Sequence, residues 1–388
     1  MESAGDLLRL ALRYGPGGQS LRSTAAWAEM GCVASISDVA LLNRLRKASD
    51  WLCAIVDSLL PKVAIEPIEG PSRCIRLLDA SSVSRPRSIG TDWRLHASYD
   101  LRRSRFTHFE LTGAEGGEVF QRFPIAADDI VIGDRGYARH TGLRAVRDAG
   151  ADFLVRAGWR TQRLRDVDGA SVDLAEVYQQ AAAKGLLERR VVIEEPLSKG
   201  PGIGARMIVL PKSAAQSDRS RLRVVHKNRK KGRRTHPMSL VAADYLVLLT
   251  TLDAEDYPAD RVIALYRMRW QIELAFKRLK SLIGIHKLPA RDPDLAKAWL
   301  AAHLIVGLLI DAGTGKVLDS PPARQVNHSG PSIWRVHKVL HSSITTAVAG
   351  IILTEYLLLS LARTIRHFCD PPRRRPAQAL TARHLPPR

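Results

Sequence analysis

The chain has 388 residues, of which 45% are hydrophobic and 25% charged, a composition that excludes a disordered chain and allows two or three structural units with a full core. Its 59 Lys and Arg residues outnumber 39 Asp and Glu, which gives a formal net charge of +20. This excess favours a polyanionic partner: nucleic acid is the first choice, with a ribosomal or membrane-surface role as the alternative.

The cysteines and the apolar segments indicate a protein of a reducing compartment, the cytoplasm. No signal peptide is visible, and the apolar runs at 298–310 and 344–362 are interpreted as buried helices rather than membrane spans. We therefore expect no membrane partner. Four cysteines, which form neither a CxxC pair nor a zinc-like spacing, are predicted to be free thiols: Cys32, Cys53, Cys74 and Cys369.

Residues 1–66 are predicted to form a helical N-terminal domain. One helix starts near Leu7 and ends at the glycine-rich residues 15–18, and Ser20 caps a second helix. A longer helix is expected from Ser37 through Leu60, with basic residues on its polar side. A short turn followed by a basic helix is typical of a helix-turn-helix DNA reader, and a plain helical bundle is the alternative.

A linker at 67–72 precedes a region in which strands and helices alternate. Two of its segments, 93–99 and 105–111, are separated by a polar turn and should pair with each other. A helix is expected to end near Arg147. This alternation predicts an α/β fold with a mixed sheet. The strands are expected at 74–79, 93–99, 105–111, 129–134 and 152–156.

Residues 158–245 have a different pattern, with strand-like segments and frequent Gly, Pro and Ser. The basic run at 227–234 is interpreted as a solvated loop or, equally, as a phosphate-binding surface. A buried strand is expected at 245–250. Helices are expected at 295–313 and 333–368, and the Pro- and Arg-rich end at 371–388 is expected to be disordered.

Residues 266–280 read as one helix without Pro or Gly. Its apolar face would pack in a core, and its polar face carries one carboxylate among cations and a phenol. The simplest interpretation is a surface helix with ordinary charge pairs. The alternative is chemistry on a phosphodiester, because a carboxylate can hold a metal ion while Arg and Lys hold phosphate. The polar face contains Tyr266, Arg269, Glu273, Lys277 and Lys280.

Two further acids, Asp79 and Asp134, each lie at the end of a short, predicted apolar strand. Because side chains beyond strand ends gather at one edge of an α/β sheet, these acids and Glu273 could together bind two divalent cations. Each aspartate could instead be an ordinary turn residue. The neighbouring acids Asp92, Asp128 and Asp129 are interpreted as structural.

The spacing Tyr266-x2-Arg269-x3-Glu273-x6-Lys280 is similar to the Y-R-E-K signature of bacterial insertion-sequence transposases of the IS-four family. The resemblance extends to the segments around Asp79 and around Asp134, and it covers the chain from the N-terminal helices to about residue 315. One departure is the alanine that follows Asp79, where glycine is frequent in the family.

This resemblance implies an RNase H-like catalytic domain with a DDE triad. Asp79, Asp134 and Glu273 would be the catalytic metal ligands for two Mg²⁺ ions, with Mn²⁺ as an alternative. The family also has a largely β insertion, which fits residues 158–245. No local motif assigns a role in it to Trp159. The residues expected to contact DNA are Tyr266, Arg269, Lys280, Lys277 and Arg135.

The predicted architecture is therefore an α/β, RNase H-like mixed sheet flanked by helices, with further segments around it. The catalytic domain comprises 67–157 and 246–315, and the β-rich insertion comprises 158–245. The segments outside it are a helical DNA-binding domain at 1–66, a C-terminal helical region at 316–370 and a basic tail at 371–388.

The function that this interpretation predicts is metal-dependent cleavage at transposon ends, followed by strand transfer into target DNA. Because two ends must meet, a homodimer on DNA is expected. The rival hypotheses are an RNase H-like nuclease that cuts without joining, and a DNA-binding repressor derived from a transposase.

Overall fold

A computed structural model of the chain describes residues 3–30, 33–60, 73–85, 87–88, 90–194, 202–289, 291–319 and 332–348. The predicted linker, the C-terminal tail, Cys32 and Cys369 lie outside these ranges, as does most of the apolar run at 344–362. Cys53 and Cys74 are free thiols, as predicted. The chain divides into two compact units: unit 1 contains Met1–Pro67, Ala80–Gly116 and Ile272–Arg388, and unit 2 contains Ile68–Asp79 and Gly117–Gln271.

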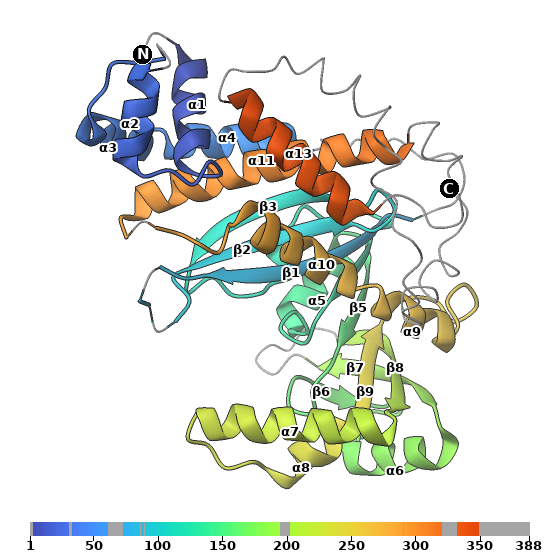
Figure 1. The fold of residues 1–388 in the computed structure, drawn as a ribbon. Coiled ribbons are helices and arrows are strands. Elements are labelled where there is room, and N and C mark those ends of the chain that lie inside the picture. The colour runs from blue at the N-terminus through green and yellow to red at the C-terminus, as the bar shows by residue number, and fades with distance from the viewer. Residues whose placement is uncertain are drawn as a thin grey trace. The chain divides into compact units, whose positions relative to one another are not determined.

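Unit 1 combines helices with the antiparallel pair β2–β3, in which Trp93 lies opposite Gly113 (Figure 1). The pairing of these two strands is confirmed. Unit 1 also contains the end of β1 and most of α10, both of which begin in unit 2. Its other elements are α1 (Ala4–Tyr14), α2 (Leu21–Met30), α3 (Asp38–Lys47), α4 (Ser49–Leu59), β2 (Trp93–Asp100), β3 (Arg105–Gly113), the π-helical turn η3 (Leu279–Ile283), α11 (Pro293–Asp319) and α13 (Ile333–Val348).

Serine side chains begin three of the N-terminal helices. Ser3 and Ser37 accept hydrogen bonds from the first turns of α1 and α3, and Ser20 does the same for α2. The predicted single helix from Ser37 to Leu60 is wrong, because the chain breaks at Ala48 into α3 and α4. Side-chain periodicity did not reveal this break, since alanine is a good helix former.

Helix α11 is the buried centre of unit 1 and packs against α1, α3, α4, α13 and β3. It is the one described helix that is long and apolar enough to cross a membrane, yet 78% of its apolar window is buried inside the protein. A core helix of a soluble protein passes the same test, so burial supports the interpretation of 298–310 as a core segment.

Unit 2 is a mixed sheet covered by helices, with the strand order β1-β4-β5-β9-β8-β7-β6. Strands β1, β4 and β5 are parallel, whereas β5–β9, β9–β8, β8–β7 and β7–β6 are antiparallel, so the predicted mixed α/β sheet is confirmed. Its elements are β1 (Ile75–Val83), the 3-10 turn η1 (Phe120–Arg122), β4 (Ile130–Gly133), α5 (His140–Asp148), β5 (Asp152–Arg156), β6 (Arg163–Arg165), α6 (Leu174–Lys184), β7 (Leu187–Glu194), β8 (Ile203–Pro211), α7 (Ala214–Lys230), α8 (Pro237–Val241), the 3-10 turn η2 (Ala242–Asp244), β9 (Tyr245–Thr250), α9 (Ala259–Arg267) and the start of α10 (Trp270–Arg278).

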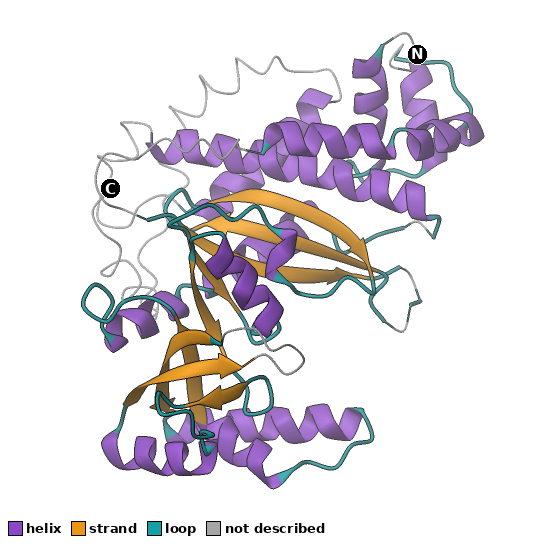
Figure 2. Cartoon of the chain, turned by 180° about the vertical axis from the view of Figure 1, so that it is seen from behind, coloured by secondary structure: helices purple, strands orange, loops and turns teal. Residues whose placement is uncertain are grey.

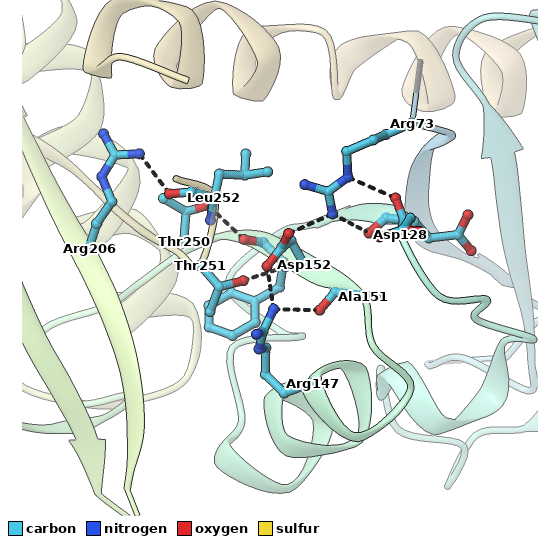
Figure 3. Close-up of polar contacts among 11 residues, drawn as sticks. Arg73, Asp128, Arg147, Ala151, Asp152, Arg206, Thr250, Thr251 and Leu252 are labelled. Atoms are coloured by element: carbon cyan, nitrogen blue, oxygen red, sulfur yellow. Dashed lines mark hydrogen bonds and ion pairs between the residues drawn. The ribbon is translucent and has the colours of Figure 1, made fainter. Parts of the chain in front are cut away.

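Charged side chains fasten the N-terminal ends of β4 and β5 (Figure 3). Arg73 pairs with Asp152 at 2.5 Å and donates to the Asp128 carbonyl at 2.9 Å. Arg147 also pairs with Asp152. On the other side of β5, Thr250 in β9 donates to the Phe153 carbonyl at 2.7 Å. These bonds fix the position of β5 along the strand direction relative to β4 and β9.

Residues 158–245 are less purely β than predicted. Strands β6, β7 and β8 continue the sheet beyond β9, but helices α6, α7 and α8 gather beside them (Figures 1 and 2). The longest element of the segment is α7, with 17 residues. Helix α7 was not predicted because it is highly charged. A helix without a continuous apolar face gives a weak periodic signal.

Candidate active site

The register of two parallel strands brings Asp79 and Asp134 to the same level. Leu77 in β1 lies opposite Ile132 in β4, and the two aspartates follow two residues further along their chains. Side chains two residues apart in a strand share a face, and neighbouring strands lie about 4.8 Å apart. Extending this register by two residues predicts neighbouring positions for Asp79 and Asp134.

Asp134 follows directly after β4, as predicted, but Asp79 does not end its strand. β1 continues to Val83, so the expected strand end at Asp79 is wrong. The residues after Asp79 are Ala-Ser-Ser, which are poor strand formers and resemble a turn. β1 extends nevertheless because β2 lies beside it in the strand order.

Arg269 connects the Y-R-E-K segment to the first aspartate. Its Nη1 lies 3.5 Å from Asp79 Oδ2, and both side chains are about one-fifth exposed, at 19% and 18%. This distance is long for an ion pair, and both side chains are partly exposed. The arginine thus places a positive charge beside the Asp79 carboxylate.

Tyr266 belongs to the same group of side chains. Burial, and to a smaller extent the charge of Asp134, raises the pKa of Tyr266 above its ordinary value, while Arg269 and Arg156 oppose that shift. Tyr266 also shares a hydrogen bond with Arg269. Unit 2 therefore gathers the phenol, the two aspartates and two arginines in one place, and Tyr266 stays protonated at neutral pH.

A tight turn shapes the backbone after Asp134. The Gly136 amide donates to Asp134 Oδ1 at 2.6 Å. The carboxylate thus accepts a hydrogen bond from the backbone two residues further along the turn. A Cβ on Gly136 would lie 2.0 Å from Glu118 Oε2 and 3.0 Å from Asp134 Oδ1. A side chain here would displace the Glu118 carboxylate, which lies close to this turn, and would press on Asp134.

Glu118 and Arg156 are members of this group that the sequence did not reveal. Arg156 ends β5 as Asp134 follows β4, so its place beside a predicted strand end was the signal that could have found it. Glu118 lies in a loop and has no such signal in the sequence.

The predicted single helix over 266–280 is interrupted. Helix α9 ends at Arg267 and α10 begins at Trp270. The amides of Met268 and Arg269 bond to carbonyls three residues earlier, at 3.0 and 3.1 Å, which tightens the turn between the two helices. The regular helical spacing from which one polar face was inferred therefore does not hold across this break.

The other signature residues lie in the part of α10 and η3 that belongs to unit 1. Glu273 and Lys277 are exposed, and Lys280 is half-buried in the π-helical turn. On the opposite side of this segment, Ile272 and Leu279 are buried as the apolar stripe predicted. The structure thus confirms the amphipathic character of 272–280 within its own unit.

Arg135 and Trp159 lie in the loops of unit 2. Arg135 is exposed. Its Cδ lies 2.7 Å from the position that a Cβ on Gly158 would occupy. The Trp159 ring lies between the Arg160 guanidinium, 4.2 Å from its centroid, and the His236 ring at 4.9 Å. Its Nε1 donates to Ser239 at 3.2 Å. Trp159 therefore joins the start of the 158–245 segment to its end.

The donor chemistry of the group fits a hard divalent cation. Asp79 and Asp134 supply carboxylate oxygens, which Mg²⁺ and Mn²⁺ prefer. Within the described ranges, no three of His, Cys, Asp and Glu gather closely enough to form a metal site without additional ligands. Mg²⁺ commonly completes its shell with water and substrate phosphate.

Carboxylates bordered by arginines suit phosphoryl transfer on nucleic acid, and the comparisons with known proteins show this class of enzyme. The chain matches the family described as Transposase DDE domain over residues 70–309. It is 40% identical to the transposase for insertion sequence element IS421 of Escherichia coli, an alignment covering 83% of this chain and 88% of the relative. The InsL protein of insertion sequence element IS186A, from E. coli strain K12, has the same identity and coverage.

A more distant relative is the transposase for insertion sequence element IS231E of Bacillus thuringiensis subsp. finitimus, 22% identical with 62% of this chain and 58% of the relative covered. The chain belongs to the DDE transposase family, consistent with the IS-four group that its signature resembles. It is a DNA transposase, an enzyme of DNA cleavage and strand transfer whose family depends on divalent metal and has an RNase H-like domain.

Proposed function

We propose that Asp79, Asp134 and Glu273 are the catalytic carboxylates and that they hold two Mg²⁺ ions, for which Mn²⁺ can substitute. The observation that supports this most directly is the β1–β4 register, which aligns the two aspartates on neighbouring parallel strands. The chemistry that two such cations supply when bound is neutralisation of phosphate charge and activation of an attacking oxygen.

The basic signature residues orient the DNA strand. Arg269, whose Nη1 lies 3.5 Å from Asp79 Oδ2, turns its guanidinium toward a phosphate when a cation compensates the carboxylate charge. Tyr266 stays a neutral hydrogen-bond donor because burial raises its pKa. Lys277, Lys280 and the exposed Arg135 contact phosphates further along the strand.

The reaction has two in-line phosphoryl transfers. Water first attacks the phosphodiester at the transposon end, and the bond to the 3′ oxygen breaks to release a 3′-hydroxyl. That hydroxyl then attacks a phosphodiester of target DNA and displaces its 3′ oxygen. Because two ends must be joined to one target, the protein acts as a homodimer on DNA, with the C-terminal helices as the interface.

The domain division in this proposal follows the sequence. Residues 1–66 bind DNA, 67–157 and 246–315 form the catalytic domain, 158–245 form the insertion, and 316–370 and 371–388 form the C-terminal region and tail. In support of a DNA-binding role at the N-terminus, α3 carries Arg44, Arg46 and Lys47 in its last turn. The cytoplasm, where the nucleoid lies, is the proposed location.

The test incubates the full chain with DNA that spans the flanks of its own gene, with Mg²⁺ or Mn²⁺, beside Glu273→Gln. Wild-type cuts at inverted repeats, absent in the variant, are expected. Cuts that persist in Glu273→Gln would contradict the triad. Cuts without joined products would identify a nuclease. Binding without cuts by either protein would indicate either a lost partner or element end, or a protein that only binds DNA.

A further inference from the structure

Helix α7 is a basic surface that the catalytic group does not use. It spans Ala214–Lys230, and Ser217 is its only buried residue among those described. One row of its exposed side chains repeats every three or four residues and is entirely cationic: Arg219, Arg223, Lys227 and Lys230. The chain continues this charge past the helix end with the exposed residues Lys231, Arg233 and Arg234.

The opposite face of α7 is fastened to unit 2. Arg221 pairs with Asp244 in η2, and Asn228 donates to Thr235 at 3.2 Å. Lys212 donates to Ser220 at 3.3 Å, and burial lowers the pKa of Lys212 to about 8. The cationic row is therefore carried by a helix with a fixed orientation within its unit.

The cationic row has no acidic counterpart in the described residues. No ion pair involves Arg219, Arg223, Lys227 or Lys230, and the only acid within α7 is Asp218. Like charges four residues apart on a helix destabilise it. Such a row is unfavourable for folding alone and becomes favourable when a polyanion lies along it.

We propose that the cationic row of α7 binds the phosphate backbone of duplex DNA, separately from the catalytic group and without reading sequence. This inference rests on the proposed function, since it assigns a surface to the DNA on which a transposase acts. The row is about 17 Å long, a length over which one DNA strand presents about five phosphates.

The side chains of α7 distinguish duplex DNA from other polyanions. The helix has no Phe, Tyr or Trp on which single-stranded bases could stack. Its exposed apolar side chains are Leu222 and Val225, too few for the broad apolar face of a membrane-bound helix. Asn228, whose amide could read an adenine, is bonded to Thr235 instead.

The test compares two triple variants with equal loss of charge. Arg219→Gln/Arg223→Gln/Lys227→Gln removes the row, while Arg163→Gln/Lys184→Gln/Arg190→Gln removes three exposed cations elsewhere in unit 2. Binding of the full chain to a random-sequence duplex is measured by fluorescence anisotropy between about 50 and 200 mM salt. Glutamine is a good helix former, and circular dichroism confirms that α7 folds.

Loss of three phosphate contacts should lower the salt slope of log K by about 2.7, so the α7 variant loses about 40-fold less affinity than wild type over that salt range. The matched control and Arg219→Lys/Arg223→Lys should keep the wild-type slope. Equal slopes for the α7 variant and the matched control would overturn the proposal, as would stronger competition by single-stranded DNA or by anionic vesicles than by duplex.

Cleavage at the element ends is scored in parallel, so that the two proposals fail separately. A reduced slope in the α7 variant without Glu273-dependent cleavage would retain the α7 surface and reject the catalytic proposal. Glu273-dependent cleavage with an unchanged slope would reject the α7 surface and retain the catalytic proposal.

Discussion

Unit 2 has carboxylates and arginines at both ends of β4 and β5, and the two ends differ in how these charges are satisfied. At the N-terminal end, Arg76 and Asp129 pair at 2.7 Å with side chains only 4% exposed. At the other end, Arg269 and Asp79 are 3.5 Å apart and about one-fifth exposed. The same residue types therefore form a short, buried pair at one end of these strands and a longer, partly exposed pair at the other. We call the end with Arg76 and Asp129 the closed edge and the end with Asp79 and Asp134 the open edge.

The difference teaches that the number of charges does not identify a site. In a short, buried pair, the carboxylate oxygen already has a partner. Separating the two charges would leave each one buried without compensation, which costs a large free energy. A longer, partly hydrated pair can exchange its partner for a metal ion or a phosphate. The acids Asp128 and Asp129, interpreted from the sequence as structural, lie at the closed edge.

The largest effect is expected at the open edge. Asp134→Asn removes a carboxylate that we propose as a metal ligand, so cleavage of element-end DNA should fall by at least about 10³-fold. Thermal unfolding should change little, because Asn can still accept the Gly136 amide bond. Cleavage within about twofold of wild type would contradict the assignment of this edge.

Substitution at the closed edge should lower the free energy of unfolding. Asp129→Asn leaves Arg76 buried beside a neutral side chain, and breaking such a pair costs about 3–5 kcal/mol. Chemical denaturation should detect this loss. Asp128→Asn is the matched control, since its side chain is exposed and asparagine tolerates its positive φ of 64°. Equal stability of the two variants would refute the distinction.

An intermediate effect is expected at Gly136. Alanine there would collide with Glu118 at 2.0 Å and press on Asp134, so cleavage should fall by about 10²-fold through misplacement of the carboxylate. Gly204→Ala is the control, because a Cβ at Gly204 in β8 meets no atom within 4 Å. If both variants cleave at the wild-type rate, the turn is not required for the site.

The smallest effect concerns a buried group that belongs to neither edge. Burial lowers the pKa of His303 in α11 to about 3, below the value of about 6.5 in the unfolded chain. The unfolded state therefore takes up the proton first. The stability associated with neutral His303 is complete above pH 6.5 and is lost as the pH falls toward 3.

His303→Gln should remove this pH dependence of the unfolding free energy. The slope that is lost is at most about 1.4 kcal/mol per pH unit in that window. The difference between variant and wild type is measured by denaturation at several pH values. His337, whose pKa burial also lowers to about 3, and Asp311, whose pKa burial raises to about 6, contribute equally to both proteins. Parallel pH profiles would show that His303 does not titrate as described.

Much of unit 2 could be predicted because its strands are short apolar runs. The expected bounds at 152–156 and 245–250 coincide with β5 and β9, whose central residues are fully buried. Asp134 was found for the same reason, since it follows such a run. The end of β1 was misjudged because its pairing with β2 outweighs the low strand propensity of Ala-Ser-Ser.

Other features depend on contacts between distant parts of the chain. The break at Met268 and Arg269 lies in a segment with no Pro or Gly, so local propensity gives no sign of it. Glu118 reaches the Asp134 turn only because Gly136 has no side chain. Helix α7 was missed because its packed face is narrow and its other faces are charged.

The most direct test of the central claim is a calorimetric titration of the full chain with Mn²⁺ in the absence of DNA. We predict heat of binding for wild type and for the exposed control Asp148→Asn, with a large loss of affinity in Asp79→Asn and Asp134→Asn. Equal Mn²⁺ binding by all four proteins would contradict the assignment of the open edge as the metal-binding part of the active site.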